Sequence, residues 1–135
     1  MTLIVDASVA SKWVLPEDGA ERASRLRERD DDIIAPALIV SEIANAIWKR
    51  IVWGELETDD AVAALGSAVN IVARLIPLEE LAKNALAIAA ELKHPIYDCF
   101  YVALAEREGA PLVTADNRLL TVAKKTKFKG LVMPL

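Results

Sequence analysis

Histidine and cysteine are almost absent from the sequence, which holds one of each. One cysteine cannot form an internal disulfide, and the two residues cannot supply the clustered ligands typical of a zinc site. The single histidine, His94, directly precedes a proline, and no serine lies in a G-x-S-x-G turn. The sequence therefore disfavours a Ser-His-acid hydrolase. Cys99 has no base partner in the pattern, and we interpret it as a small packing residue.

Long apolar runs and targeting segments are also lacking. No apolar run approaches the ~18 residues that a membrane-spanning helix needs. The amino terminus has no basic stretch leading into an apolar region, which is the pattern of a secretory signal. We therefore expect a cytoplasmic protein that makes no use of a membrane.

An excess of positive charge is missing as well. The formal net charge is −4 and the isoelectric point is about 5.0. Nonspecific coating of nucleic acid relies on clustered lysine and arginine, so the sequence argues against that function. An enzyme that acts on nucleic acid stays open, because a bound cation reverses the local sign of charge. The basic run AKKTKFKG near the carboxyl end is interpreted either as a solvated surface or as a contact to a substrate backbone.

Apolar residues, in contrast, are abundant. They make up 54% of the 135 residues, and the mean hydropathy is +0.29. The chain has no repeat and no Gly/Ser linker, so residues 1–135 are expected to form one domain. A soluble monomer rarely exposes large apolar patches, and the surplus predicts a partner or a second copy of the chain.

Short apolar runs alternate with helical patterns along the chain. We predict strands at residues 3–5, 33–35, 75–78, 112–113 and 131–133. We predict helices at residues 17–29, from Pro36 to about 53, at 61–74 after an N-cap near Thr58, and at 78–93, 97–107 and 117–125. This alternation predicts an α/β fold in which helices cover both faces of a parallel sheet. In such folds the binding site lies beyond the carboxyl ends of the strands, where the strand order reverses.

Four acidic residues fall at places where such a site is expected. Asp6 and Asp116 each follow a predicted strand; either alone is typical of an N-cap, but two at one sheet edge favour a shared site. Glu42 lies among apolar neighbours in the helix predicted from Pro36 to about 53, with Asn45 three residues later, which favours a functional role. The alternative interpretation is that Glu42 lies on a single exposed edge of this helix. Asp98 lies in the first turn of a helix, where an ordinary terminal acid is the alternative.

Such a set of acids has a chemical consequence. Four converging carboxylates repel one another and take up protons unless a cation lies between them. All-oxygen ligation suits Mg²⁺ or Mn²⁺. A site of this kind supports attack of metal-activated water on a phosphodiester.

The segments around these acids also resemble a known family. Asp6 followed by Ser8, Glu42 followed by Asn45, YDCFYVALA around Asp98, and LVTADNRLL together resemble the PIN-domain ribonucleases. More narrowly, they resemble the VapC toxins of bacterial and archaeal toxin–antitoxin pairs. The resemblance extends over essentially the whole chain in order and length.

The resemblance implies a fold, an activity and partners. The fold is a three-layer α/β/α sandwich around a central parallel sheet, and the activity is endonucleolytic cleavage of RNA that depends on Mg²⁺ or Mn²⁺. Family members usually form homodimers and bind a small VapB-type antitoxin along the active-site groove, for which the helix segment IANAIWKRIVW offers a surface. The implied site residues are the metal-binding acids Asp6, Glu42, Asp98 and Asp116, the orienting hydroxyls Ser8 and Thr114, and, ranked lower, Asn45 and Asn117.

Other functions stay open beside this one. A PIN-fold RNA-processing nuclease outside a toxin–antitoxin pair would share all of these motifs. A non-catalytic PIN-fold binding module would be expected to lack one of the acids, and none is missing. A phosphoaspartate enzyme with Asp6 as nucleophile is disfavoured, because Ser8 occupies the position where such enzymes are expected to have a second acid.

Overall fold

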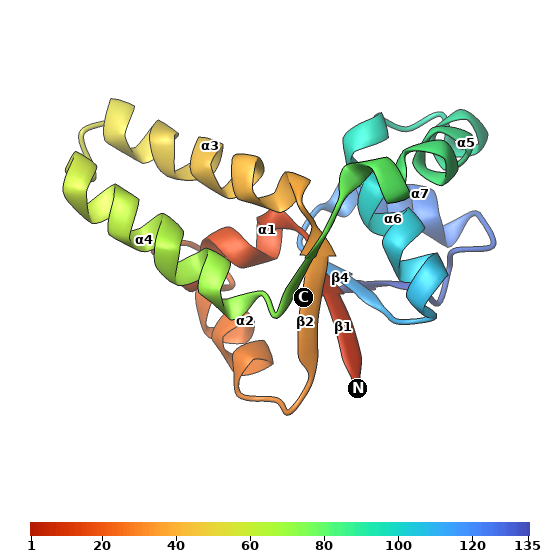
Figure 1. Ribbon diagram of the computed structural model, residues 1–135, viewed down its shortest axis with the longest axis horizontal. Coiled ribbons are helices and arrows are strands. Elements are labelled where there is room, and N and C mark those ends of the chain that lie inside the picture. Colours follow the sequence, from red (N-terminus) through yellow and green to blue (C-terminus); the bar gives the residue numbers. More distant parts are fainter.

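A five-stranded parallel sheet forms the centre of the protein, in a computed structural model that describes residues 1–135 (Figure 1). The spatial order of the strands is β3-β2-β1-β4-β5, and each neighbouring pair is parallel. Leu3, Ile4 and Val5 of the central strand are all buried, as expected where helices cover both faces. The strands are β1 (Thr2–Val5), β2 (Asp32–Pro36), β3 (Arg74–Ile76), β4 (Leu112–Thr114) and β5 (Val132–Pro134).

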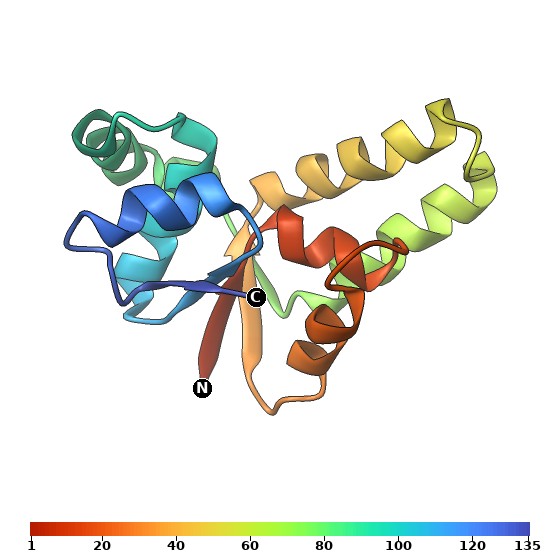
Figure 2. The same ribbon diagram turned by 180° about the vertical axis from the view of Figure 1, so that it is seen from behind.

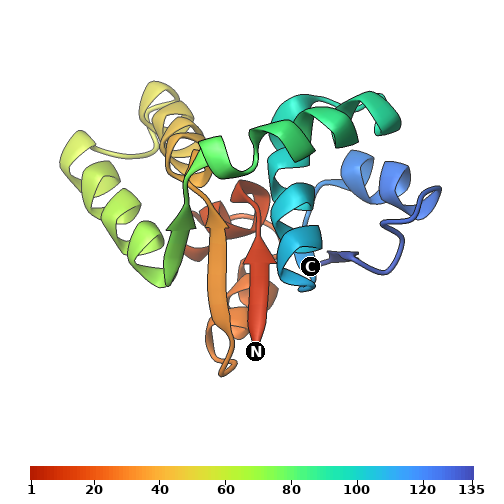
Figure 3. The same ribbon diagram turned by 45° about the vertical axis from the view of Figure 1, so that its right-hand side comes forward.

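Seven α-helices and two short 3₁₀ turns connect these strands. The first four helices are α1 (Ala7–Ala10), α2 (Ala20–Arg27), α3 (Leu38–Val52) and α4 (Thr58–Ile71), with the turn Ser11–Trp13 after α1. The later ones are α5 (Ala82–Leu92), α6 (Ile96–Glu108) and α7 (Asn117–Lys124), with the turn Leu78–Glu80 before α5. Figure 3 shows the first group on one side of the sheet and α5, α6 and α7 on the other. The predicted α/β/α sandwich with a central parallel sheet is confirmed.

The order of the strands places a reversal between β1 and β4. From β1 the chain moves to β2 and β3 on one side, and it then crosses over through α5 and α6 to β4 and β5 on the other. Right-handed crossovers put the helices of these two directions on opposite faces. The carboxyl ends of β1 and β4 therefore border the crevice in which α/β proteins bind their ligands.

Helices α3 and α4 pack against each other and extend away from the sheet as an arm, seen from both sides in Figures 1 and 2. The arm carries large apolar side chains that no other part of the chain covers: Trp48, Val52, Trp53 and Val62 are between 56% and 67% exposed. No helix of the chain has the length and apolar character needed to cross a membrane.

Most predicted elements are present, with several differences at their ends. Pro36 was predicted to begin a helix but is the last residue of β2. It lies beyond the pairing of β2 with β1, which ends at Ile34, so its missing N–H interrupts no bond to that strand. The helix predicted at 61–74 runs instead from Thr58 to Ile71, because the residues from Arg74 on pair with β2.

Two further differences concern short elements. The helix predicted at 78–93 consists of a 3₁₀ turn followed by α5, and β3 ends before Pro77 rather than reaching residue 78. Helix α1 was not predicted, because four residues are too few to show a helical period. It matters for the site, since it turns the chain directly after β1 and carries Ser8.

Candidate functional site

Asp6 lies at the carboxyl end of β1 and is 5% exposed. It is the N-cap of α1, and its Oδ1 accepts hydrogen bonds from the Ser8 hydroxyl at 2.5 Å and from the Val9 N–H at 3.3 Å. Its Oδ2 accepts a hydrogen bond from the Thr114 hydroxyl at the end of β4. The two oxygens of this carboxylate are therefore held from two sides, Oδ1 by residues of α1 and Oδ2 by the end of β4.

The surroundings of Asp6 disfavour its charged form. Burial is the main cause, the charge of Asp98 adds to it, and the hydrogen bonds from Ser8, Thr114 and Val9 oppose it; the net effect raises the pKa of Asp6 from 3.8 to about 6. A buried carboxylate that is only partly compensated by hydrogen bonds is a candidate for a cation-binding group.

Asp116 is connected to Asp6 through one hydroxyl group. Thr114 Oγ1, which donates to Asp6, accepts a hydrogen bond from the Asp116 N–H at 3.0 Å, and Ser8 Oγ accepts one from the Ala115 N–H at 2.9 Å. The side chain of Asp116 caps α7, because its Oδ1 accepts hydrogen bonds from the first N–H groups of that helix. Both strand-end acids are thus N-caps and neighbours in one hydrogen-bonded network.

Glu42 lies in the second turn of α3, on the side that faces the crevice. Its Oε1 accepts a hydrogen bond of 2.5 Å from the phenol of Tyr101, which is 1% exposed on α6. Burial and the charge of Asp98 raise the pKa of Glu42, while the hydrogen bond from Tyr101 lowers it. Glu42 is therefore paired, and the predicted alternative of a merely exposed helix edge is not what the structure shows.

Asp98 lies in the first turn of α6, as predicted. Its Oδ2 is 2.6 Å from Nε2 of His94, and the His94 side chain is 5% exposed. The two residues are four positions apart across Pro95, a spacing that brings side chains together where a helix begins. The charge of Asp98 acts on both Asp6 and Glu42, which places these three acids within electrostatic reach of one another.

The donor set fits a hard divalent cation. Glu42 and Asp98 each use one carboxylate oxygen for a hydrogen bond, and the second oxygen of each accepts none from the protein. No three acidic, histidine or cysteine side chains are close enough together to hold a metal ion as they stand. Mg²⁺ is commonly held by one or two carboxylates together with waters and substrate phosphates, so a preformed cage is not required.

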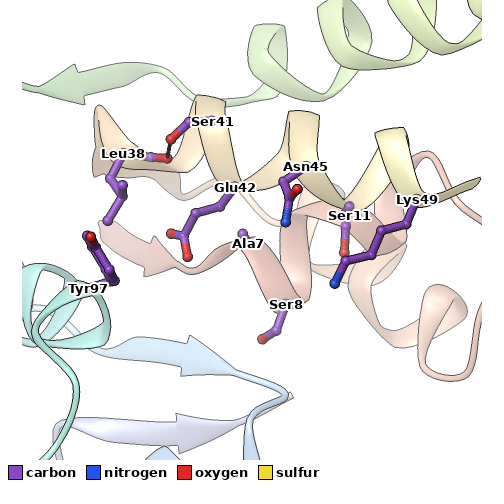
Figure 4. Close-up of a pocket in the computed structure, with 10 residues that line it drawn as sticks. Ala7, Ser8, Ser11, Leu38, Ser41, Glu42, Asn45, Lys49 and Tyr97 are labelled. Carbon is purple, nitrogen blue, oxygen red and sulfur yellow. Dashed lines mark hydrogen bonds between the residues drawn. The ribbon is translucent and has the colours of Figure 1, made fainter. Parts of the chain in front are cut away.

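An open pocket of about 500 Å³ adjoins the acids, between α1, α3 and the start of α6 (Figure 4). Glu42, Asn45 and Lys49 project into it from α3, Ser8 lies on the α1 side, and Tyr97 lies at the α6 end. Asn45 and Asn117 were the two lower-ranked candidates for the site. Asn45 lines this pocket, whereas Asn117 lines a different depression beside Thr114.

Sequence reasoning missed four residues of this region. Tyr101 follows Asp98 by three positions and His94 precedes it by four, so the spacing along the chain places both near Asp98. The hydrogen-bond partner of Tyr101, however, is Glu42, which is 59 residues away in the chain. Lys49 lies seven positions after Glu42, on the same face of the helix, and Tyr97 precedes Asp98. No pattern in the sequence joined the two elements that carry them.

Comparison with known proteins identifies the family to which this fold belongs. The family model described as the PIN domain matches residues 3–125. The chain therefore belongs to the PIN-domain family.

The curated relatives narrow the class further. The chain is 33% identical over 99% of its length to all of Ribonuclease VapC3 of Pyrobaculum aerophilum. It is 35% identical over 87% of its length to Ribonuclease VapC9 of Mycobacterium tuberculosis, of which 87% is covered. A crystal structure of PAE2754 from Pyrobaculum aerophilum superimposes with a TM-score of 0.72 and 25% identity, covering 99% of this chain and 83% of that one. The predicted resemblance to VapC proteins is confirmed.

Proposed function

We propose that the protein is an endoribonuclease that requires Mg²⁺ or Mn²⁺ and acts as the toxin of a toxin–antitoxin pair. The observation that carries this proposal is the group of Asp6, Glu42 and Asp98 at the strand-order reversal of a PIN domain, where burial and the charge of Asp98 raise the pKa of the other two carboxyls. The names of the curated relatives, which are VapC ribonucleases, support RNA as the substrate.

The side chains have separate roles in the proposed reaction. Asp6, Glu42, Asp98 and Asp116 would hold the cation, which when bound activates water and neutralises charge on the scissile phosphate. Ser8 and Thr114 fix both oxygens of Asp6, so that its carboxylate cannot rotate away. Glu42 and Asp98 each keep one carboxylate oxygen that accepts no hydrogen bond from the protein, and this oxygen would be available to a cation. These hydrogen bonds restrict the rotamers of the three side chains, which lowers the cost of ordering them when a cation and substrate bind.

A cleavage assay tests the nuclease. Purified protein is incubated with total cellular RNA and Mg²⁺ or Mn²⁺, beside a sample with EDTA. The Asp98→Asn variant keeps the size of the side chain and loses its charge, and Glu79→Gln is the matched control, since Glu79 is exposed and makes no side-chain hydrogen bond or ion pair. We expect cleavage by the parent and by Glu79→Gln, and none with EDTA or Asp98→Asn. Undiminished cleavage by Asp98→Asn would contradict the assignment of these acids to the catalytic site.

The toxin role and the partners form the second part of the proposal. We propose that residues 1–135 act as one domain in the cytoplasm, form a homodimer and bind a small VapB-type antitoxin. The uncovered apolar side chains of the α3–α4 arm, including Trp48 and Trp53, support an interface there. Expression in bacterial cells is expected to arrest growth with the parent and not with Asp98→Asn, and a co-expressed antitoxin is expected to restore growth. RNA cleavage in vitro without growth arrest would favour an RNA-processing nuclease outside such a pair.

A further inference from the structure

Helix α7 and the segment that follows it carry a concentration of positive charge that the candidate site does not use. Residues 117–130 hold five basic side chains and no acidic one, although the whole chain has a formal net charge of −4. All five are exposed, and Lys127 alone has an acidic partner, because its ammonium nitrogen lies 3.8 Å from Glu91 Oε2. The other four form no ion pair, and we call them the basic surface: Arg118, Lys124, Lys125 and Lys129.

The stability of α7 accounts for only part of this charge. A lysine in the last turn of a helix, such as Lys124, interacts favourably with the negative end of the helix dipole. Arg118 lies instead in the first turn, where a cation is unfavourable, and Asp116 accepts a hydrogen bond from the Arg118 backbone N–H but none from its guanidinium. Lys129 lies five residues beyond the end of α7, outside the reach of its dipole. An anion from outside the chain explains these two positions better.

The segment after α7 is held in place by the core and by local hydrogen bonds. Phe128 is 2% exposed and packs in the core between the exposed Lys127 and Lys129. Thr126 Oγ1 donates a hydrogen bond to the Ala123 carbonyl at 2.8 Å and accepts one from the Phe128 N–H at 3.2 Å. The lysines of this segment therefore stand on an ordered backbone. An anion that binds there has to order side chains only, which lowers the entropic cost of binding.

The basic surface leads outward from the acids along α7. Asp116 is the N-cap of this helix, and Figure 2 shows the helix running from the end of β4 to a loop at the edge of the molecule. Arg118, Thr121 and Lys125 are three and four positions apart and therefore share one face, and the first two line an open depression of about 350 Å³. From Asp116 to Lys125 the chain advances nine residues, which corresponds to about 14 Å along the helix axis. Nucleotides of a stacked strand follow one another at about 3.4 Å, so this distance corresponds to about four of them.

We propose that the basic surface binds phosphates of the RNA substrate that lie about four or more nucleotides from the cleaved bond. Lysine and arginine donate to phosphate oxygens without contacting base edges, so the surface recognises charge and not sequence. RNA is favoured over an acidic protein because the row of cations begins at Asp116, where the proposed site cleaves the strand. This surface shares no residue with the pocket of Figure 4. The inference rests on the proposed ribonuclease function and adds that a long RNA is held at two separate places.

A comparison of two RNA lengths tests the inference. Fluorescein-labelled oligouridylates, a hexamer and a strand of twenty-four nucleotides, are bound to the Asp98→Asn protein in Mg²⁺ at several salt concentrations, and binding is followed by fluorescence anisotropy. The Asp98→Asn background keeps the RNA intact and is the parent of every variant. A hexamer centred on the acids extends about 10 Å to either side and therefore falls short of Lys125. The parent is expected to bind the longer strand more tightly.

A triple variant removes the distant part of the basic surface while keeping the length of the side chains: Lys124→Gln, Lys125→Gln and Lys129→Gln combined. We expect it to bind the longer strand about tenfold or more weakly than its parent, and the hexamer within about twofold of its parent. The slope of log affinity against log salt should fall by about 2, because each phosphate contact to a single strand contributes about 0.7. Arginine at the same three positions is expected to restore both the affinity and the slope.

The matched control changes the net charge by the same amount elsewhere. It combines Arg27→Gln, Arg74→Gln and Lys83→Gln, which lie on α2, β3 and α5, are exposed and form no ion pair. This control is expected to bind the longer strand within about threefold of the parent. Circular dichroism melting of each variant verifies that the fold is unchanged.

The outcomes separate this inference from the proposed function. If the parent binds both lengths equally, or if the triple variant and the control lose equal affinity, the basic surface is wrongly assigned, and cleavage of cellular RNA by the unmodified protein would still support the nuclease. Length-dependent binding that the triple variant loses, without any cleavage by the unmodified protein in Mg²⁺, would support the surface and overturn the nuclease. Poly-L-glutamate that competes as strongly as the longer strand at equal charge would overturn RNA as the occupant, in favour of an acidic protein.

Discussion

Replacement of Tyr101 by phenylalanine tests whether a buried phenol organises the acids. Tyr101 is 1% exposed, and its ring stays packed in the variant because only the hydroxyl oxygen is lost. That oxygen is the donor to Glu42 Oε1. Since the hydrogen bond lowers the pKa of Glu42, against burial and the charge of Asp98, its removal raises the pKa further and favours the neutral carboxylic acid.

The size of the effect follows from the contact that is deleted. A hydrogen bond to a charged group contributes about 1.5–3 kcal/mol. Glu42 borders the pocket and water can replace part of the contact, so the lower value applies. A loss of about 1.5 kcal/mol in the charged, oriented form of Glu42 corresponds to a metal affinity that is about tenfold weaker. Removing the phenol leaves Glu42 Oε1 without its donor, so the free energy of unfolding is also expected to fall by about 1.5 kcal/mol, and the metal affinities are compared between folded proteins.

Calorimetric titration with Mn²⁺ at neutral pH measures this difference directly. Tyr97→Phe is the control, because it removes the same atom from an exposed tyrosine that makes no hydrogen bond to an acid. Urea unfolding without metal confirms that both variants are folded. Mn²⁺ affinity of Tyr101→Phe equal to that of the parent, with the fold intact, would refute the role of Tyr101 in positioning Glu42.

Three further predictions concern titration, reactivity and backbone strain. The folded state raises the pKa of Asp6 from 3.8 to about 6. Between these two pH values the folded protein therefore binds more protons than the unfolded protein. In EDTA, the free energy of unfolding should fall by about 3 kcal/mol as the pH rises across this range. Urea titrations of Asp6→Asn should lack this slope, and parallel curves would contradict the assignment. Burial raises the pKa of Cys99 to about 11, so iodoacetamide should label it in urea but scarcely in the native protein; rapid native labelling would count against that environment. Lys93 ends α5 with φ 52°, so Lys93→Gly should stabilise the protein by about 0.5–1 kcal/mol in urea unfolding, and a loss of stability would contradict the strain.

The local sequence pattern predicted much of the fold because burial in the tertiary core leaves a recognisable apolar pattern in each strand and helix. Leu3, Ile4 and Val5 form a fully apolar run, which predicted a buried strand, and Gly109 ends α6 with φ 60°, as its position after the helical pattern indicated. Pro36 was misassigned because a proline suits both the first turn of a helix and the end of a strand. The pairing of β2 with β3 decided between the two, and that pairing joins segments about forty residues apart.

For the site, the sequence by itself determined which residue types stand at the strand and helix ends: Asp6 and Asp116 after apolar strands, Asp98 in a first helical turn, and Glu42 in an apolar helix. Only the tertiary structure decided which of them act on one another. Thr114 reaches Asp6 across 108 positions of the chain and Tyr101 reaches Glu42 across 59, because β4 lies beside β1 and α6 packs against the sheet facing the start of α3. Periodicity reports the environment of each element, whereas the order in which strands assemble depends on packing among segments distant in the chain.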